Sequence, residues 1–396
     1  MAETPTNLLV DLRAASRLAI DATRALTDVV EAMHHAVSPI ETRSGAPRTS
    51  GLTGFVYRSV RGVAGVAGGG IDLALGRLAP LLPARRRRPA EEAVIAALNG
   101  VIGDRLHDSG NTLAIPMQFR VGGQALALEA DALRAMLPGA TSRIVVLVHG
   151  LCMNDLQWSR DGHDHGAALA RDLGVTPVCL HYNTGRHISS NGAAFAELME
   201  GLLAAWPVPV DDVAIVAHSM GGLVARSAHD AAERRGMTWT QQLSRIVFLG
   251  TPHHGAPLER GGNALDLVLS LSRFTTPIAR IGQLRSAGIT DLRHGSVLDA
   301  DWRGRDRFER GSRRRPLALP AGVRCHAIAA TTAKQDRPRL PGDGLVPVDS
   351  ALGRYADPRF DLGLPPSQQW VAHATNHLQL QTDARVYAQI KTWLAH

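Results

Sequence analysis

The sequence predicts an α/β fold with a mostly parallel central sheet flanked by helices. Residues 143–148 form a continuous apolar run, which is typical of a central parallel strand covered on both faces. Residues 213–216 form a second apolar run, followed directly by a tight turn and a helical segment at 222–235. In a chain of 396 residues, 45% of them hydrophobic, this succession indicates one large α/β domain with a sizeable core.

The turn after residue 216 carries a serine and has the layout of a nucleophile elbow. Ala217 and Gly221 lie two places before and after Ser219, and Gly222 follows. Small residues are needed at these places because the sharp turn brings strand and helix so close that larger side chains would collide. Such a turn lifts Ser219 to the carboxyl end of the sheet, where the N-terminus of the helix stabilises negative charge. Ser219 is therefore the predicted nucleophile.

A serine needs a base, and the downstream sequence offers an acid and a histidine in the order that such hydrolases use. Asp343 lies between glycines after an apolar run at 323–330 that we predict to be a strand. His377 lies in a loop before a terminal helix predicted at 379–394. We expect His377 to take the proton of Ser219 and Asp343 to fix the imidazole tautomer. The rivals that stay open are His373 for the base and Asp349 or Asp336 for the acid.

An oxyanion hole is expected beside the serine. The strand predicted at 143–148 runs into Gly150, which allows the chain to swing so that the next N–H points into the site. The predicted donors are the backbone N–H groups of Leu151 and Met220, and loss of one such donor lowers a rate by about 100- to 1000-fold. Contacts to the substrate are expected from four neighbouring residues: His149, Gly150, His218 and His253.

In combination, these motifs resemble those of bacterial lipases and related α/β-hydrolases, a group that includes the inositol-deacylating, PGAP-like enzymes acting on membrane lipids. The resemblance covers roughly residues 140–396. It implies an α/β-hydrolase fold and hydrolysis of carboxylic esters through an acyl-enzyme, with Ser219, Asp343 and His377 as the triad. The segments that carry it are HGL at 149–151, AHSMGG at 217–222, GTPHHG at 250–255, GDGLV at 342–346 and NHL at 376–378.

A metal site is not expected. Many bacterial lipases have an acidic residue two places after the catalytic histidine, where it helps to bind calcium, and Gln379 occupies that place here. The cluster of Asp161, His163, Asp164 and His165 lacks the spacing of a zinc site. We therefore expect neither a metal nor another cofactor.

The cysteines and the first residues bear on the compartment. Cys152, Cys179 and Cys325 are odd in number and form no disulfide framework, which favours a reducing compartment. Residues 1–13 include acidic side chains and lack the pattern of a signal peptide, although many of the lipases that the chain resembles are secreted. No stretch reaches the roughly 18 uncharged apolar residues of a spanning helix. We expect a cytoplasmic protein, with association to a membrane left open.

The net charge of +7 comes from arginine, because lysine occurs only at positions 334 and 391. Arginine clusters at 85–88 and 303–315 suit either solvated loops, which we expect, or contact with anionic lipid. We expect no nucleic-acid partner because no DNA-binding motif or aromatic interleaving accompanies the charge.

We predict a helical N-terminal extension at 1–90 ahead of a hydrolase domain at 91–396. Residues 5–36 have the pattern of an amphipathic helix, and the small alanines of its stripe favour packing against another helix. Residues 52–82 are apolar and glycine-rich. We expect both segments to fold against the hydrolase domain as a helical hairpin; docking on a membrane or covering the pocket are the alternatives. The stripe consists of residues 8, 12, 15, 19, 22, 26, 29 and 33.

Two further segments belong to the predicted hydrolase domain. Residues 112–119 and 125–128 alternate about a Gly-Gly pair and predict a β-hairpin at the antiparallel edge of the sheet. Residues 257–320 form an insertion that begins with an apolar segment at 265–271. This insertion fits either a mobile lid or a fixed cap.

The sequence thus predicts a serine carboxylic-ester hydrolase that acts on acyl esters of a lipid-like kind. One alternative is a phospholipid or glycolipid deacylase at a membrane surface, with peripheral contact through the N-terminal helices. The other is a non-catalytic scaffold whose hydrolase domain presents these helices to partners, which the complete triad disfavours.

Overall fold

The computed structural model describes residues 8–37, 51–78, 87–256, 285–304, 314–335 and 340–395. The chain divides into two compact units, which we call the hairpin unit and the sheet unit. The hairpin unit consists of residues 4–88 and 108–113, and the sheet unit of residues 1–3, 89–107 and 114–396.

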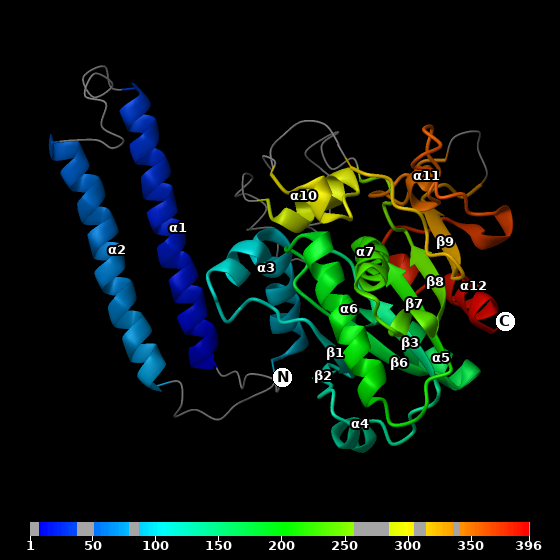
Figure 1. The fold of residues 1–396 in the computed structure, drawn as a ribbon. Helices are drawn as coiled ribbons and strands as arrows, with labels where there is room; N and C mark the ends of the chain where they lie inside the picture. The colour runs from blue at the N-terminus through cyan, green and yellow to red at the C-terminus, as the bar shows by residue number, and fades with distance from the viewer. Residues whose placement is uncertain are drawn as a thin grey trace. The chain divides into compact units, whose positions relative to one another are not determined.

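The sheet unit contains an eight-stranded sheet in the order β10-β9-β8-β7-β3-β6-β1-β2 (Figure 1). Neighbouring strands are parallel from β10 to β6, and β1 pairs antiparallel with β6 and β2. This order confirms the α/β-hydrolase fold that the sequence predicts. The strands of the sheet are β1 (Gln118–Val121), β2 (Gln124–Ala125), β3 (Arg143–Val148), β6 (Thr176–His181), β7 (Asp212–His218), β8 (Leu243–Leu249), β9 (Arg324–Thr331) and β10 (Gln369–His373). A separate two-stranded ribbon pairs β4 (Ser159–Arg160) with β5 (His163–Asp164).

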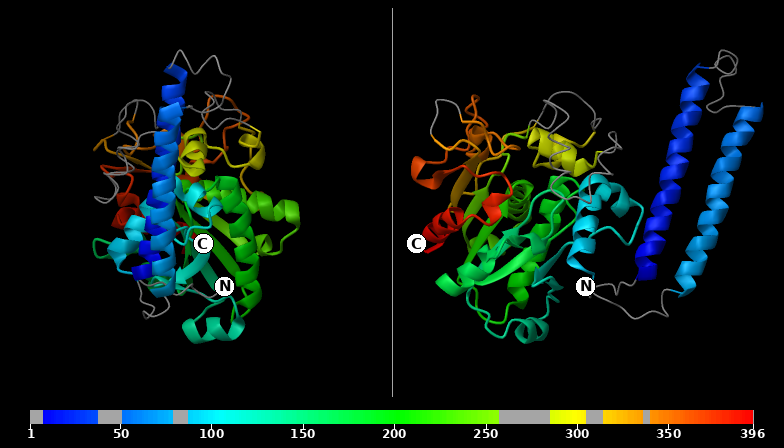
Figure 2. Two further views of the ribbon diagram at one scale, coloured as in Figure 1. Left: turned by 90° about the vertical axis from the view of Figure 1, so that its left-hand side faces the viewer. Right: turned by 180° about the vertical axis from the view of Figure 1, so that it is seen from behind.

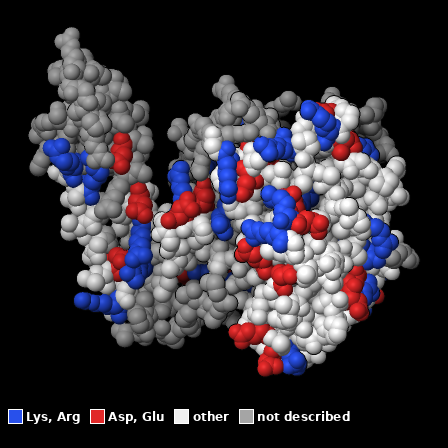
Figure 3. Space-filling view, in the orientation of Figure 1, with Lys and Arg blue, Asp and Glu red and all other residues white. Residues whose placement is uncertain are grey.

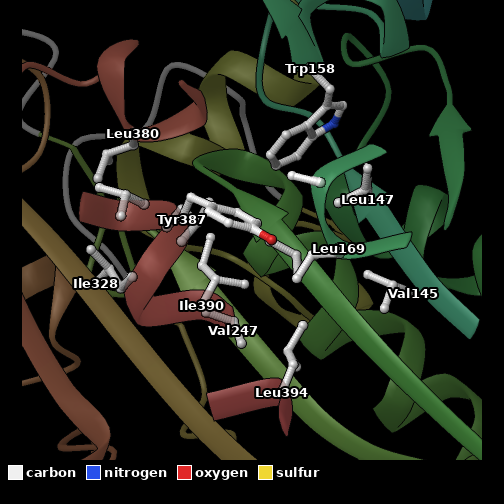
Figure 4. Close-up of a cluster of buried hydrophobic side chains, with 14 of the residues drawn as sticks. Val145, Leu147, Trp158, Leu169, Val247, Ile328, Leu380, Tyr387, Ile390 and Leu394 are labelled. Atoms are coloured by element: carbon white, nitrogen blue, oxygen red, sulfur yellow. The ribbon is translucent and has the colours of Figure 1, made fainter. Parts of the chain in front are cut away.

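Helices cover both faces of the sheet (Figures 1 and 2). The α-helices of this unit are α3 (Pro89–Asp108), α4 (Ala130–Met136), α5 (His165–Leu173), α6 (Ile188–Ala205), α7 (Met220–Arg235), α10 (Ala287–His294), α11 (Val348–Ala351) and α12 (Ala384–Ala395). Short 3₁₀ turns are η2 (Asp155–Trp158), η3 (Trp239–Gln241), η4 (Asp299–Asp301), η5 (Pro366–Gln368) and η6 (Gln379–Gln381). On the face of α5 and α12, Leu169 and Ile390 pack with Val145, Leu147 and Val247 of the strands in one buried apolar cluster (Figure 4).

The two central strands, β3 and β7, have the sequences RIVVLV and DVAIVAH. Nearly every residue of both is buried, because helices cover both faces, and this is why their apolar runs are continuous instead of alternating. Val148 at the end of β3 is paired with Ala217 of β7, and His218 is paired with Leu249 at the end of β8. The loops after these three strands therefore begin side by side at one edge of the sheet.

Some boundaries differ from the predictions. The edge hairpin exists, but its strands are short and confined to residues 118–121 and 124–125, around Gly122 and Gly123 at positive φ. The terminal helix begins at Ala384 and not at residue 379, because the 3₁₀ turn η6 precedes it. Residues 257–284 and 305–313 of the insertion, with its apolar start, lie outside the described residues, so its role as lid or cap stays a prediction.

The hairpin unit consists of two long helices, α1 (Leu8–Val37) and α2 (Gly51–Leu78), which run side by side (Figures 1 and 2). Asp72 of α2 receives hydrogen bonds from the guanidinium groups of Arg13 and Arg17 on α1. Arg61 of α2 lies 2.8 Å from Asp28 of α1. Charged side chains of opposite sign thus link the two helices. Among the helices that the structure describes, none combines the length and the hydropathy of a membrane span.

The predicted contact face of α1 is the exposed one. Leu8 and Leu12 of the stripe are 51% and 47% exposed, whereas Ala14, on the other side of the helix, is 3% exposed. The stripe consists of apolar residues and alanines, but the ion pairs of Arg13 and Arg17 with Asp72 turn a mixed face of α1 toward α2. The expected helix-on-helix contact therefore exists, but the stripe residues whose exposure is described, 8 to 22, lie on the exposed side of α1.

A buried group of charged side chains joins α3, β1, η2 and β6 in the sheet unit. Nη1 of Arg120 lies 3.4 Å from both Glu92 Oε2 and Asp155 Oδ1. His181 Nδ1 lies 3.1 Å from the same oxygen of Asp155. All four residues are at most 9% exposed, so the charges of Arg120, Glu92 and Asp155 are compensated by one another and not by water.

We expect Asp155→Ala to lower the free energy of unfolding by about 3 kcal/mol, because it leaves a buried arginine short of a counter-charge. Urea denaturation followed by tryptophan fluorescence measures this, since all six tryptophans lie in the sheet unit. Asp131→Ala is the matched control: its carboxylate pairs with Arg134 but is 98% exposed, and we expect a change below about 0.5 kcal/mol. Equal effects of the two substitutions would contradict the prediction.

Candidate active site

Ser219 occupies a strained turn between β7 and α7. Its φ of 54° and ψ of −125° lie in a region that residues other than glycine rarely adopt. Gly221 and Gly222 make the turn possible. A Cβ on Gly221 would lie 2.6 Å from the carbonyl oxygen of Val148, and one on Gly222 would lie 2.1 Å from Thr251 Oγ1. Both distances are too short for real atoms, which confirms the predicted need for small residues here.

The predicted acid and base meet at the same edge of the sheet. His377 Nδ1 lies 2.7 Å from Asp343 Oδ2. The other carboxylate oxygen of Asp343 accepts hydrogen bonds from the N–H groups of Leu345 and Val346, at 2.9 and 2.8 Å. When Nδ1–H donates to the carboxylate, Nε2 of a neutral imidazole is free to accept a proton. A general base for a serine hydroxyl needs this protonation pattern.

The two rival residues that the structure describes, Asp349 and His373, belong to α11 and β10. The Asp349 side chain in α11 is 77% exposed and lies 3.8 Å from Arg354. His373 ends β10, where it is paired with Thr331 of β9. Asp336 lies outside the described residues. Of the candidate acids and bases, Asp343 and His377 are the two that the structure brings together.

His218 connects the serine turn to the loop of the base. Its Nε2 donates a hydrogen bond to the backbone carbonyl oxygen of His377 at 3.0 Å, and the two ring centroids are 4.7 Å apart. The side chain is fully buried. Burial holds the pKa of His218 well below its ordinary value, so the ring is neutral and its one proton is on Nε2. The residue before the nucleophile thus fixes the backbone of the base.

Gly250, directly after β8, has a role that the sequence did not reveal. Its φ is +58°, and a Cβ there would lie 3.2 Å from both Asp343 Oδ2 and His377 Cε1. The absence of a side chain therefore lets the acid and the base lie against the end of β8. A glycine after a predicted strand was the available signal, but the groups that it faces come from distant segments.

The backbone beside Ser219 contains the two predicted oxyanion donors. Among the residues that the structure describes, no backbone oxygen accepts a hydrogen bond from the N–H of Leu151 or of Met220. Gly150 lies against the nucleophile, since a Cβ there would be 2.9 Å from Ser219 Cβ. These positions are compatible with an oxyanion hole.

The ring of His149 orients one of these donors. Its Nδ1 donates to the carbonyl oxygen of Gly150 at 3.0 Å. Because C=O and N–H of a trans peptide point in opposite directions, this bond directs the N–H of Leu151 away from the ring. Burial lowers the pKa of His149 to about 3, which keeps the ring neutral. Tyr182 stacks on it at 4.5 Å and donates its hydroxyl to the His149 carbonyl at 2.8 Å.

The expected substrate contacts of three histidines need correction. His149, His218 and His253 are 0%, 0% and 1% exposed. His253 lies 3.4 Å from Arg226 through Nδ1, and its carbonyl oxygen accepts a hydrogen bond from Arg314. These side chains are enclosed by protein groups, so they hold loops in place instead of facing a substrate. Gly150 remains the predicted contact that lies beside the serine.

The histidine-rich segment at 161–165 serves the fold. His163 Nε2 lies 2.7 Å from His165 Nδ1, and His165 Nε2 donates to the carbonyl oxygen of Leu380 at 3.1 Å. Asp164 caps α5 by accepting from the N–H of Ala167. No group of three metal-binding side chains occurs among the described residues.

One family model and several solved structures of low identity match this chain. Residues 196–317 match the family model described as "PGAP1-like alpha/beta domain". Among curated protein sequences, none matches the chain. The mature form of the lipase BlEst2 from Bacillus licheniformis is 18% identical, with a TM-score of 0.41, over 63% of this chain and 91% of that one. Lipase B of Aspergillus fumigatus is 12% identical, with a TM-score of 0.40, over 69% of this chain and 59% of that one. The thioesterase RedJ of Streptomyces coelicolor is 18% identical, with a TM-score of 0.37, over 69% of this chain and 96% of that one. The family match confirms the resemblance to α/β-hydrolases that the motifs predict.

We expect EDTA to leave the melting temperature unchanged, because Gln379 replaces the acidic residue that helps to hold calcium in many lipases and because Asp164 and His165 serve structural contacts. Differential scanning fluorimetry with and without EDTA measures this. A fall of several degrees that added calcium reverses would show that other ligands form a metal site.

Proposed function

We propose that the protein is a serine carboxylic-ester hydrolase, a lipase or esterase that cleaves acyl esters through an acyl-enzyme. The observation that carries the proposal is the 2.7 Å contact of His377 with Asp343, at the sheet edge where β7 delivers Ser219. In the proposed triad, Ser219 is the nucleophile, His377 the base and Asp343 the acid.

The proposed chemistry has two halves. Ser219 Oγ attacks the carbonyl carbon of the ester as its proton passes to His377 Nε2, and the carbonyl electrons move to the oxygen. The N–H groups of Leu151 and Met220 stabilise this oxyanion. When the intermediate collapses, the alcohol leaves with the proton from His377, and the acyl group stays on the serine. A water molecule then gives its proton to His377 and attacks the acyl carbon, which releases the acid and restores the serine.

A phospholipid or glycolipid deacylase at a membrane surface uses the same residues and differs only in its substrate. The exposed apolar side chains of α1 and α2 favour this second candidate. A non-catalytic scaffold is disfavoured, because it has no use for a buried acid–base pair beside a strained serine. A series of p-nitrophenyl esters of increasing chain length separates short-chain from lipid-like substrates.

We expect Ser219→Ala and His377→Ala each to abolish hydrolysis of p-nitrophenyl butyrate, with a loss of at least about 10⁴-fold in kcat, since the triad acts as a unit. His373→Ala is the matched control and should keep most of the activity. A fluorophosphonate probe should label the wild type and not Ser219→Ala. Full activity of His377→Ala together with loss in His373→Ala would assign the base to His373, and an unlabelled wild type would favour the scaffold.

We expect His218→Leu to lower kcat by about 10- to 100-fold with little change in KM, because it removes the hydrogen bond that fixes the backbone of His377. His218→Gln retains an N–H donor on a side chain of similar reach and should recover part of the loss. Steady-state kinetics on the same short ester measure both variants. If His218→Leu is as active as the wild type, the hydrogen bond does not position the base.

A further inference from the structure

Exposed apolar side chains concentrate on the hairpin unit. Nine large hydrophobic side chains are exposed among the described residues, and seven of them belong to α1 and α2. Isolated apolar residues on a surface are ordinary, but a group of them on one element marks an interaction site. The seven are Leu8, Leu12, Val63, Val66, Ile71, Leu73 and Leu78.

Five of these side chains lie on α2, and we call them the apolar face of α2: Val63, Val66, Ile71, Leu73 and Leu78. Their exposed fractions run from 46% to 80%. Steps of three and seven residues put Val63, Val66 and Leu73 on one side of the helix, and Ile71 and Leu78 repeat on the adjoining side. A Cβ on Gly69 or Gly70 would meet nothing within 4 Å, so the surface between them is open as well.

Charged side chains are absent from this face over three turns. Every exposed residue between positions 62 and 74 is Gly, Val, Ala, Ile or Leu. Asp72, within this stretch, forms ion pairs with Arg13 and Arg17 of α1. Arg61, directly before it, forms an ion pair with Asp28 of α1. The ion pairs between the helices therefore leave an uncharged, apolar outer surface.

Arginine exceeds the acidic residues in the part of the sequence that contains the apolar face of α2. Residues 4–88 contain twelve arginines and six acidic residues, so most of the net charge of +7 lies in this part of the chain. Arg77 is exposed within the last turn of α2, and a run of four arginines follows at 85–88. On the sheet unit, by contrast, basic and acidic side chains are interspersed over the side that Figure 3 shows.

We propose that the apolar face of α2 docks on an anionic lipid surface, with the helix lying in the plane of the interface. An uncharged apolar face beside clustered arginines matches the chemistry of acyl chains beneath anionic headgroups. Neither helix of the hairpin qualifies as a membrane span, which agrees with a helix that lies on the bilayer. The docking surface stands on its own, but its use in bringing the enzyme to lipid esters rests on the proposed function.

A second copy of the chain fits this surface less well. Each copy carries an excess of arginine over acidic residues in this part of the chain, and like charges repel. An anionic membrane attracts the same arginines. Charge therefore favours lipid over self-association.

The test is co-sedimentation of the full chain with vesicles of phosphatidylcholine alone or with one quarter phosphatidylglycerol. The variant carries Val63→Gln, Val66→Gln and Leu73→Gln, because glutamine removes apolar surface and keeps a good helix propensity. The control is Met136→Gln, an apolar residue 40% exposed on the sheet unit. We expect the wild type and the control to bind the anionic vesicles, the triple variant to bind at least about 10-fold more weakly, and 0.5 M NaCl to weaken wild-type binding.

Four results would overturn the proposal. They are no binding of the wild type to anionic vesicles, equal binding of the triple variant, a change of the triple variant from oligomer to monomer in light scattering, and a lower melting transition of the sheet-unit tryptophans in that variant. The third would identify a second copy as the occupant, and the fourth the sheet unit. Ser219→Ala should bind vesicles like the wild type, and the triple variant should still hydrolyse p-nitrophenyl butyrate. Vesicle binding and catalysis can therefore fail separately.

Discussion

Close packing around Ser219 leaves no room for a Cβ at three glycines, which lie at the end of β3, the start of α7 and the end of β8. Gly150 follows β3, Gly221 lies in the first turn of α7 and Gly250 follows β8. A Cβ on any of them would lie within 3.2 Å of an atom from another segment. The strained φ of Ser219 belongs to the same arrangement, at a cost of about 1–3 kcal/mol. The turn persists because both its ends are anchored: the N–H of Ser219 donates to Leu249 at 2.8 Å, and its carbonyl oxygen accepts from Gly222 at 3.1 Å.

Buried neutral histidines hold the loops that this packing brings together. A neutral imidazole has one N–H, so each ring can donate only one hydrogen bond. His149 donates to the carbonyl oxygen of Gly150, and His218 donates to that of His377. Burial lowers the pKa of both rings, which keeps each in the neutral form that the contact requires. The same burial explains why histidines that lie next to the nucleophile in sequence are closed to a substrate.

The two units treat charge in different ways. In the sheet unit, Arg120, Asp155 and Glu92 compensate one another inside the protein. In the hairpin unit, Asp72 forms ion pairs with two arginines of α1, and every exposed residue of α2 between positions 62 and 74 is uncharged. The same kind of ion pair therefore supports a closed core in one unit and an open apolar surface in the other.

Features that depend on local pattern could be predicted from the sequence alone. The buried strands β3 and β7, the small residues around Ser219 and the order of Asp343 and His377 follow from apolar runs, turn sterics and chain order. Tertiary structure decided which groups meet. The contact of His377 with Asp343 and the side chains that face Gly250 come from segments far apart in the chain, so local pattern does not predict them. The burial of His149, His218 and His253 depends on distant segments in the same way. The exposure of Leu8 and Leu12 in the stripe of α1 likewise could not be predicted. The contact face of α1 depends on Asp72 of α2, and the periodicity of α1 contains no information about that residue.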